Sequence, residues 1–142
     1  MSKVSLTPAI HFPGNCDEAI QFYKGIGAIV NQVCYAKDAP KEDKEMAKLP
    51  PNFVMHSEVI FFNTLFSLTD GGEKPIPYGS HSYMVTLETA DQVTEVFNKF
   101  ANGGKVTQPL AKQWWSSWCG EVVDRFGVTW WVGTEECEGD GK

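Results

Sequence analysis

All five tryptophans of this chain lie in one stretch, Gln113-Trp-Trp-Ser-Ser-Trp-Cys-Gly-Glu-Val-Val-Asp-Arg-Phe-Gly-Val-Thr-Trp-Trp-Val132. The pattern predicts a loop, a strand, a tight turn from Asp124 to Gly127 and a second strand. Because side chains alternate along a strand, Trp130 and Trp131 point to opposite faces of the sheet. One indole is therefore expected in the packed core and the other on the far face, where it would line a cavity.

Outside this stretch, the chain carries the same helix-start signal twice. Asn15 with Glu18, and Thr89 with Gln92, have the spacing of a capping box. An apolar stripe at helical spacing follows each of them, which predicts one helix over Cys16–Ile26 and a second after Thr89. A shift of 74 residues carries Asn15 onto Thr89 and superimposes the two stripes, which indicates a weak internal duplication.

Eight segments have the composition of strands, and a long polar loop with one helical turn is expected between Lys37 and Pro51. The expected strands are Val4–Phe12, Ala28–Tyr35, Phe53–Phe62, Leu65–Thr69, Tyr83–Glu88, Lys105–Thr107, Cys119–Asp124 and Val128–Val132, with Asn63-Thr64 as a hairpin turn. Each half then reads strand, helix, strand, strand, strand.

This order predicts an α+β fold of two βαβββ modules, about residues 4–70 and 81–133. We expect them to form one curved, eight-stranded mixed sheet with both helices on its convex face. Residues 1–134 would make a single domain, and the acidic residues 135–142 a disordered tail.

Charge and cysteine usage exclude several classes of function. The net charge is −6 and the sequence has no cluster of Lys or Arg, which argues against nucleic acid and anionic membranes as partners. No apolar run is long enough for a signal peptide or a membrane span, so a cytoplasmic location is expected. The four cysteines, Cys16, Cys34, Cys119 and Cys137, form no Cys-x-x-Cys pair, which favours reduced thiols.

Three motifs in this double unit carry a resemblance to a known family. They are Pro13-Gly-Asn-Cys-Asp-Glu-Ala-Ile-Gln-Phe-Tyr23, Gly103-Gly-Lys-Val106 and Asp124-Arg-Phe-Gly-Val-Thr-Trp130. Together they resemble the PhnB-like branch of the glyoxalase/bleomycin-resistance superfamily, the vicinal-oxygen-chelate fold, over about residues 5–133. The branch often carries the label 3-demethylubiquinone 3-methyltransferase-like.

The resemblance implies a metal site in some members, with four His or Glu ligands on four strands. It places those positions at Pro8, Ser82 and Trp131, and the fourth near Ser67. Proline and tryptophan have no lone pair for a metal, and a neutral serine is a poor ligand. We therefore expect the inherited metal site to be absent, and no cofactor. Methyl transfer is disfavoured because no glycine-rich turn for a nucleotide-type methyl donor joins a strand to a helix.

The alternative hypothesis is an enzyme of this fold with a rearranged metal site. His56 and Glu58 fall on one face of one strand, and a spacing of two can present both to one ion. With His81 they would support a metal-dependent lyase, isomerase or dioxygenase acting on a small oxygenated substrate. By strand parity, His11 and His81 face away from the superfamily's ligand positions.

The main hypothesis is a binding module with an aromatic groove. Alternate strand residues place Ile10, Phe12, Ser67, Ser82, Met84, Thr86 and Trp131 along the groove, with Trp114 and Trp115 at its rim. Such a lining suits a small hydrophobic or aromatic molecule held by stacking. The same indoles are also typical of a homodimer interface, so a pocket and an interface are both open as interpretations of these residues, and a homodimer is expected.

Overall fold

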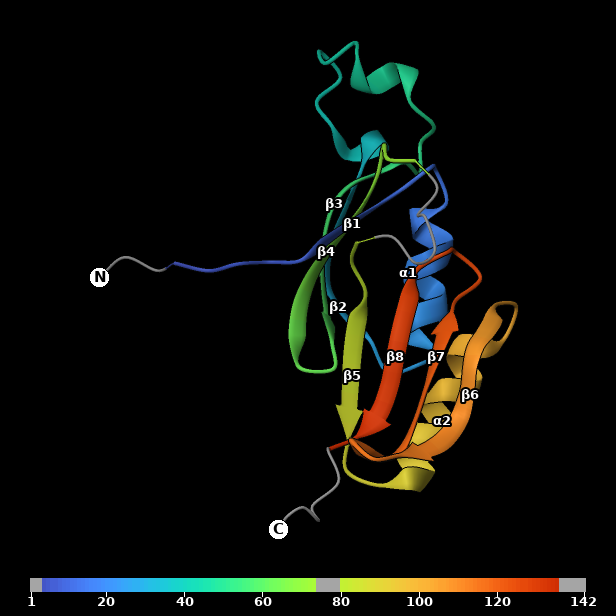
Figure 1. The fold of residues 1–142 in the computed structure, drawn as a ribbon. Helices are drawn as coiled ribbons and strands as arrows, with labels where there is room; N and C mark the ends of the chain where they lie inside the picture. Colours follow the sequence, from blue (N-terminus) through green and yellow to red (C-terminus); the bar gives the residue numbers. More distant parts are fainter. Residues whose placement is uncertain (1–3, 74–79, 136–142) are drawn as a thin grey trace. The chain divides into compact units, whose positions relative to one another are not determined.

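The structure, a computed structural model, describes residues 4–73 and 80–135. The chain divides into two compact units, residues 1–74 and 75–142 (Figure 1). Each unit contains one α-helix and four strands in the order strand, helix, strand, strand, strand. The α+β fold of two βαβββ modules is thereby confirmed.

The first module forms a four-stranded mixed sheet in the order β1-β4-β3-β2. Strand β1 runs parallel to β4, and the other neighbours are antiparallel. Its elements are β1 (Ala9–Phe12), α1 (Cys16–Lys24), β2 (Ile29–Tyr35), β3 (Val54–Phe61) and β4 (Thr64–Asp70). Two short 3-10 helices, Ala36–Asp38 and Met46–Lys48, lie in the long polar loop, where one helical turn was expected.

Helix α1 is anchored by a carboxylate that is distant in sequence. The predicted cap by Asn15 is wrong, because its side chain makes no capping hydrogen bond. Asp70, at the end of β4, instead accepts hydrogen bonds from the backbone N–H groups of Cys16 and Val54, both at 2.9 Å. The buried face of α1 then packs on the sheet, with the Tyr23 ring 5.3 Å from that of Phe61.

The hairpin between β3 and β4 turns one residue earlier than predicted. Phe62 and Asn63 occupy the turn with φ of 50° and 59°, the left-handed region that a tight hairpin requires. Thr64 consequently belongs to β4.

The second module repeats the first in its strand order, β5-β8-β7-β6. Its elements are β5 (Tyr83–Leu87), α2 (Ala90–Ala101), β6 (Lys105–Gln113), β7 (Ser116–Val123) and β8 (Thr129–Thr134). The strands thus pair as two four-stranded sheets, one in each module, in place of the single eight-stranded sheet that was expected. Strand β6 extends past the predicted Thr107 although it contains Pro109, because it is an edge strand.

Helix α2 and the turn before β8 hold the core of this module. The Thr89 hydroxyl accepts the Gln92 N–H, and the Gln92 side chain accepts the Thr89 N–H, which confirms the capping box. The indole of Trp130 is 1% exposed and stacks on Phe100 of α2 with ring centroids 4.6 Å apart. Trp130 is therefore the core indole of the predicted pair.

Three further predictions concern membrane spans, the acidic tail and the number of domains. No helix in residues 4–73 and 80–135 is long and apolar enough to cross a membrane. The predicted acidic tail lies, beyond Glu135, outside the described residues. The single domain over residues 1–134 stays a prediction.

Candidate functional site

The candidate site is a pocket of the second module with a volume of about 470 Å³. It opens among β5, the start of β7 and the end of β8. Its lining is Met84, Thr86, Trp115, Trp131, Thr134 and Glu135. A volume in this range is typical of sites for small organic ligands.

Backbone register brings the central pair of the pocket together. Strands β5 and β8 run parallel with Met84 opposite Trp131, so both side chains stand on one face of the sheet. Trp130 faces α2, and Trp131 therefore lies on the face opposite the helix. Met84 is 70% exposed there, which leaves its thioether free to meet a ligand.

Gly133 gives the Trp131 indole the space in which it lies. A Cβ atom on Gly133 would collide with the six-membered ring of Trp131 and would come within 2.7 Å of Cys119 Cβ. The indole thus lies over Gly133 of its own strand. Any larger residue at this position would force the ring out of the pocket wall.

A cluster of hydroxyl groups holds Thr134 at the end of β8. The Thr134 hydroxyl is 3.1 Å from that of Ser116 and 2.6 Å from that of Ser117, and it accepts the Trp118 N–H at 3.2 Å. Thr134 is 7% exposed. Because its hydroxyl is engaged by these neighbours, the polar groups most accessible to a ligand are Thr86 and the Glu135 carboxylate.

Of the residues predicted to form the site, the structure brings Met84, Trp115 and Trp131 together, along with Thr86. Trp114 does not line the pocket. It forms the β6–β7 turn with Trp115, where it is 84% exposed and makes an edge-to-face contact with the Trp115 ring at 5.4 Å. Ser82 is exposed just before β5 and is also outside the lining.

The predicted placement of Ile10 and Phe12 in a groove is wrong. Both are buried, at 8% and 0% exposure, and their register partners in β4 are the buried Leu68 and Asp70. Ser67 pairs with Ala9 and so lies on the other face.

The parity error has a local cause. Three residues separate β1 from α1, whereas two separate β5 from α2. A difference of one residue reverses the face of every side chain in the preceding strand. His11 is consequently on the face opposite Phe12, where its Nδ1 lies 2.7 Å from the Thr69 hydroxyl.

Thr134 and Glu135 were missed by the sequence analysis, which ended the last strand at Val132 and assigned Glu135 to the tail. Strand β8 continues to Thr134. The period of two from Trp131 through Gly133 to Glu135 is the signal that could have placed Glu135 on the pocket face.

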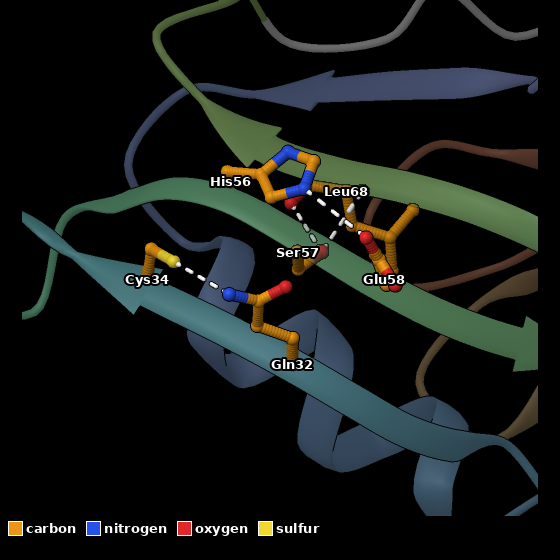
Figure 2. A network of polar contacts seen from close by, with 6 residues as sticks. All are labelled: Gln32, Cys34, His56, Ser57, Glu58 and Leu68. Atoms are coloured by element: carbon orange, nitrogen blue, oxygen red, sulfur yellow. Dashed lines mark hydrogen bonds and ion pairs between the residues drawn. The ribbon is translucent and has the colours of Figure 1, made fainter.

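The first module carries a separate polar network on its sheet (Figure 2). The His56 Nε2 is 3.7 Å from a carboxylate oxygen of Glu58, so the pair expected on one strand face is brought together. Along the neighbouring strand β2, the Gln32 amide lies 3.4 Å from the Cys34 sulfur. Both members of the His56–Glu58 pair are about half exposed, and such a pair contributes little to stability.

His81, the third member of the alternative metal set, belongs to the second module, where its Nδ1 lies 2.8 Å from the Ser80 hydroxyl. Within residues 4–73 and 80–135, no three His, Cys, Asp or Glu side chains are grouped as metal ligands would be.

The thiols of the described residues are free. Burial, and then the nearby Asp70 and Asp17 carboxylates, raise the pKa of Cys16 well above its ordinary value. Because the thiolate is the nucleophile, Cys16 is a core residue with no reactive role at neutral pH. Cys137 lies outside the described residues.

The two βαβββ modules have the glyoxalase/bleomycin-resistance fold. Residues 4–133 match the model of the 3-demethylubiquinone-9 3-methyltransferase family, and the chain belongs to that family, the PhnB-like branch. The resemblance drawn from the three sequence motifs is thereby confirmed.

Three known proteins show how far this likeness extends. Protein YjdN of Escherichia coli (strain K12) is 26% identical over 138 residues, which span 89% of this chain and 92% of YjdN. The structure of a putative 3-demethylubiquinone-9 3-methyltransferase, PhnB protein, from Bacillus cereus matches with a TM-score of 0.77 at 22% identity, over 92% of this chain and 99% of that one. The fosfomycin resistance protein FosX from Listeria monocytogenes matches with a TM-score of 0.69 at 9% identity, over 97% and 98%.

At the positions that the resemblance assigned to metal ligands, the side chains present do not fit a divalent ion. At Trp131 the structure presents an indole ring to the pocket, and Pro8 contributes its carbonyl to the Ser67 N–H at 2.9 Å. Neither side chain offers a lone pair, and Ser67 and Ser82 offer neutral hydroxyls.

Proposed function

We propose that this protein binds a small hydrophobic or aromatic molecule in the pocket of its second module, without a metal ion. The observation that carries the proposal is the wall made by the two indoles of Trp115 and Trp131 beside the exposed Met84 thioether. Aromatic rings stack on such surfaces at offset or edge-to-face geometry, and thioethers add favourable contacts with ring edges.

The binding hypothesis is better supported than the two catalytic alternatives. A methyltransferase needs a site for a methyl donor, and the sequence has no glycine-rich strand-to-helix turn of the nucleotide-binding type. At the β1–α1 junction, the first helical N–H is already bound by the Asp70 carboxylate. For a metal-dependent enzyme, His56 and Glu58 supply two donors that are about half exposed, and no group of three His, Cys, Asp or Glu side chains is found in residues 4–73 and 80–135.

The five indole N–H groups provide an internal test. In a spectrum of the ¹⁵N-labelled protein, a panel of bicyclic aromatic molecules should shift the Trp115 and Trp131 indole signals. Two signals serve as controls, because Trp130 Nε1–H donates to Asp124 at 2.8 Å and Trp118 Nε1–H donates to the Thr94 hydroxyl at 2.8 Å.

Each signal is assigned by a Trp→Phe variant. If no compound in the panel moves the Trp115 and Trp131 signals, or if all five signals shift together, the pocket is not a specific site. Met84→Ala should lower the affinity for any compound that binds, since it removes the thioether from the pocket wall.

A homodimer in the cytoplasm completes the proposal. Its support is the exposure of two adjacent indoles, Trp114 at 84% and Trp115 at 41%, since exposed apolar clusters mark interaction surfaces. Reduced thiols at Cys16, Cys34 and Cys119 suit a reducing compartment. Sedimentation equilibrium should give the dimer mass for the wild type and a lower mass for Trp114→Ser, and a monomeric wild type would refute the dimer.

A further inference from the structure

The pocket of the second module has charge of one sign. Glu135 is the charged member of its lining, and the other lining side chains are apolar or carry hydroxyl groups. A second carboxylate, Glu121 of β7, is the register partner of Trp131 and therefore lies on the same sheet face. Its orientation is fixed by a 3.0 Å hydrogen bond from the Thr107 hydroxyl.

Basic side chains of this module are not part of the lining. Lys99 lies on α2 and pairs with Glu95 at 3.3 Å, and α2 packs on the face of the sheet opposite the pocket. Arg125 donates from Nε to the Asn102 carbonyl at 3.1 Å, beyond the far end of the second helix. Among the described residues, an anionic ligand would therefore meet the Glu135 carboxylate in this pocket without a lining cation to pair with.

The indoles add to the same preference. A tryptophan face carries the negative part of the ring quadrupole and attracts a cation placed over it, by about 0.5–2 kcal/mol depending on exposure. Trp115 and Trp131 supply two such rings in one cavity, next to the soft sulfur of Met84. Stacking, cation–π attraction and a carboxylate at the rim are thus available to one flat ligand.

We propose that the ligand of this pocket is a flat organic cation, such as an N-alkylated or protonated aromatic heterocycle, selected by Glu135 over its neutral and anionic counterparts. This inference rests on the proposed function, because it names the class of molecule that the aromatic pocket takes. The carboxylate provides the selection and the indoles provide the surface for stacking.

Three probes of one shape test the inference by equilibrium dialysis: N-methylquinolinium, its neutral isostere 1-methylnaphthalene, and the anion 1-naphthoate. We expect the cation to bind about five- to tenfold more tightly than the neutral probe, in line with one cation–π contact and a partly exposed carboxylate, and the anion to bind most weakly. Added salt should weaken the binding of the cation and leave the affinity for the neutral probe unchanged.

Two charge-neutralising variants separate a local effect from a general one. Glu135→Gln should reduce the affinity for the cation by about fivefold. The affinity for the neutral probe should stay within about twofold of the wild-type value. Glu95→Gln removes the same charge from α2, on the other face of the sheet, and should leave all three affinities unchanged.

Each result decides a different point. If the neutral probe binds as tightly as the cation, and Trp131→Ala weakens both, the cation inference is overturned while the proposed aromatic binding function is kept. If neither probe binds, both fail. If Glu95→Gln weakens the cation as much as Glu135→Gln does, the preference comes from overall charge and the role of Glu135 is refuted.

Discussion

Asp124 is the residue whose replacement gives the sharpest test of how this fold holds its tryptophans. Its carboxylate is 3% exposed and accepts three N–H groups. One oxygen accepts the backbone N–H groups of Phe126 and Val128 at 2.8 and 3.1 Å, which closes the turn before β8. The other accepts the Trp130 indole N–H at 2.8 Å. We consider the substitution Asp124→Asn.

The magnitude follows from the number of donors. An asparagine oxygen can keep the two backbone bonds, but its amide NH₂ group then faces the Trp130 indole N–H, and neither group is an acceptor. The variant loses the charge of the acceptor and leaves a buried donor unsatisfied, which together should lower the free energy of unfolding by about 2–4 kcal/mol. Asp124→Ala leaves all three donors without this acceptor and should cost more.

Urea unfolding followed by tryptophan fluorescence measures the change. Asp43→Asn is the matched control, because the Asp43 carboxylate accepts the Met46 N–H at 3.1 Å on the exposed long loop. Asparagine serves as well as aspartate in such a role, so the control should change stability by about 0.5 kcal/mol or less. In the ¹⁵N spectrum, the Trp130 indole signal should move in Asp124→Asn. An unchanged signal with a loss no greater than that of the control would refute the reasoning.

Three further outcomes are expected. Gly133→Ala should displace the Trp131 indole and abolish ligand shifts of its signal while the protein stays folded, as circular dichroism would show. The hydrogen bond to Asp17, together with burial, raises the pKa of Tyr35 from 10.0 to about 12. Between pH 10 and pH 12 the unfolded chain loses the Tyr35 phenol proton before the folded protein does. The free energy of unfolding should therefore fall as pH rises through this window. Tyr35→Phe should remove the part of the fall that comes from this phenol. Thr89→Ala removes the cap of α2 and should cost about 1 kcal/mol in urea unfolding, and an unchanged midpoint would contradict the role of the cap.

Local signals in the sequence were sufficient wherever the physical cause is also local. The Thr89 and Gln92 capping box involves residues three apart, and the structure contains it. At Asn15 the same reasoning gave the wrong cap, because a competing acceptor, Asp70, arrives from 54 residues away. The cap of α1 therefore depends on the fold of the module, although the start of the helix at Cys16 was predicted correctly.

The candidate site divides in the same manner. Met84 and Trp131 were each assigned to the groove from the alternation of their own strand, and the parallel register between β5 and β8 places them on one face. Trp115 lies at the pocket because it belongs to the β6–β7 turn. The position of this turn depends on the full length of β6, an edge strand that contains Pro109. Glu135 was assigned to the tail because the last strand was ended at Val132, two residues before β8 ends at Thr134.

The sequence by itself determined the order of the elements, the duplication of the βαβββ unit and the pairing of one buried with one pocket-facing indole, because periodicity and capping act over a few residues. Only the tertiary structure decided which face of β1 is buried and which groups close the pocket. A single extra residue in the β1–α1 connection turns Ile10 and Phe12 into the core. The pocket wall exists only where parallel register sets Met84 beside Trp131 and the missing side chain of Gly133 leaves room for the indole.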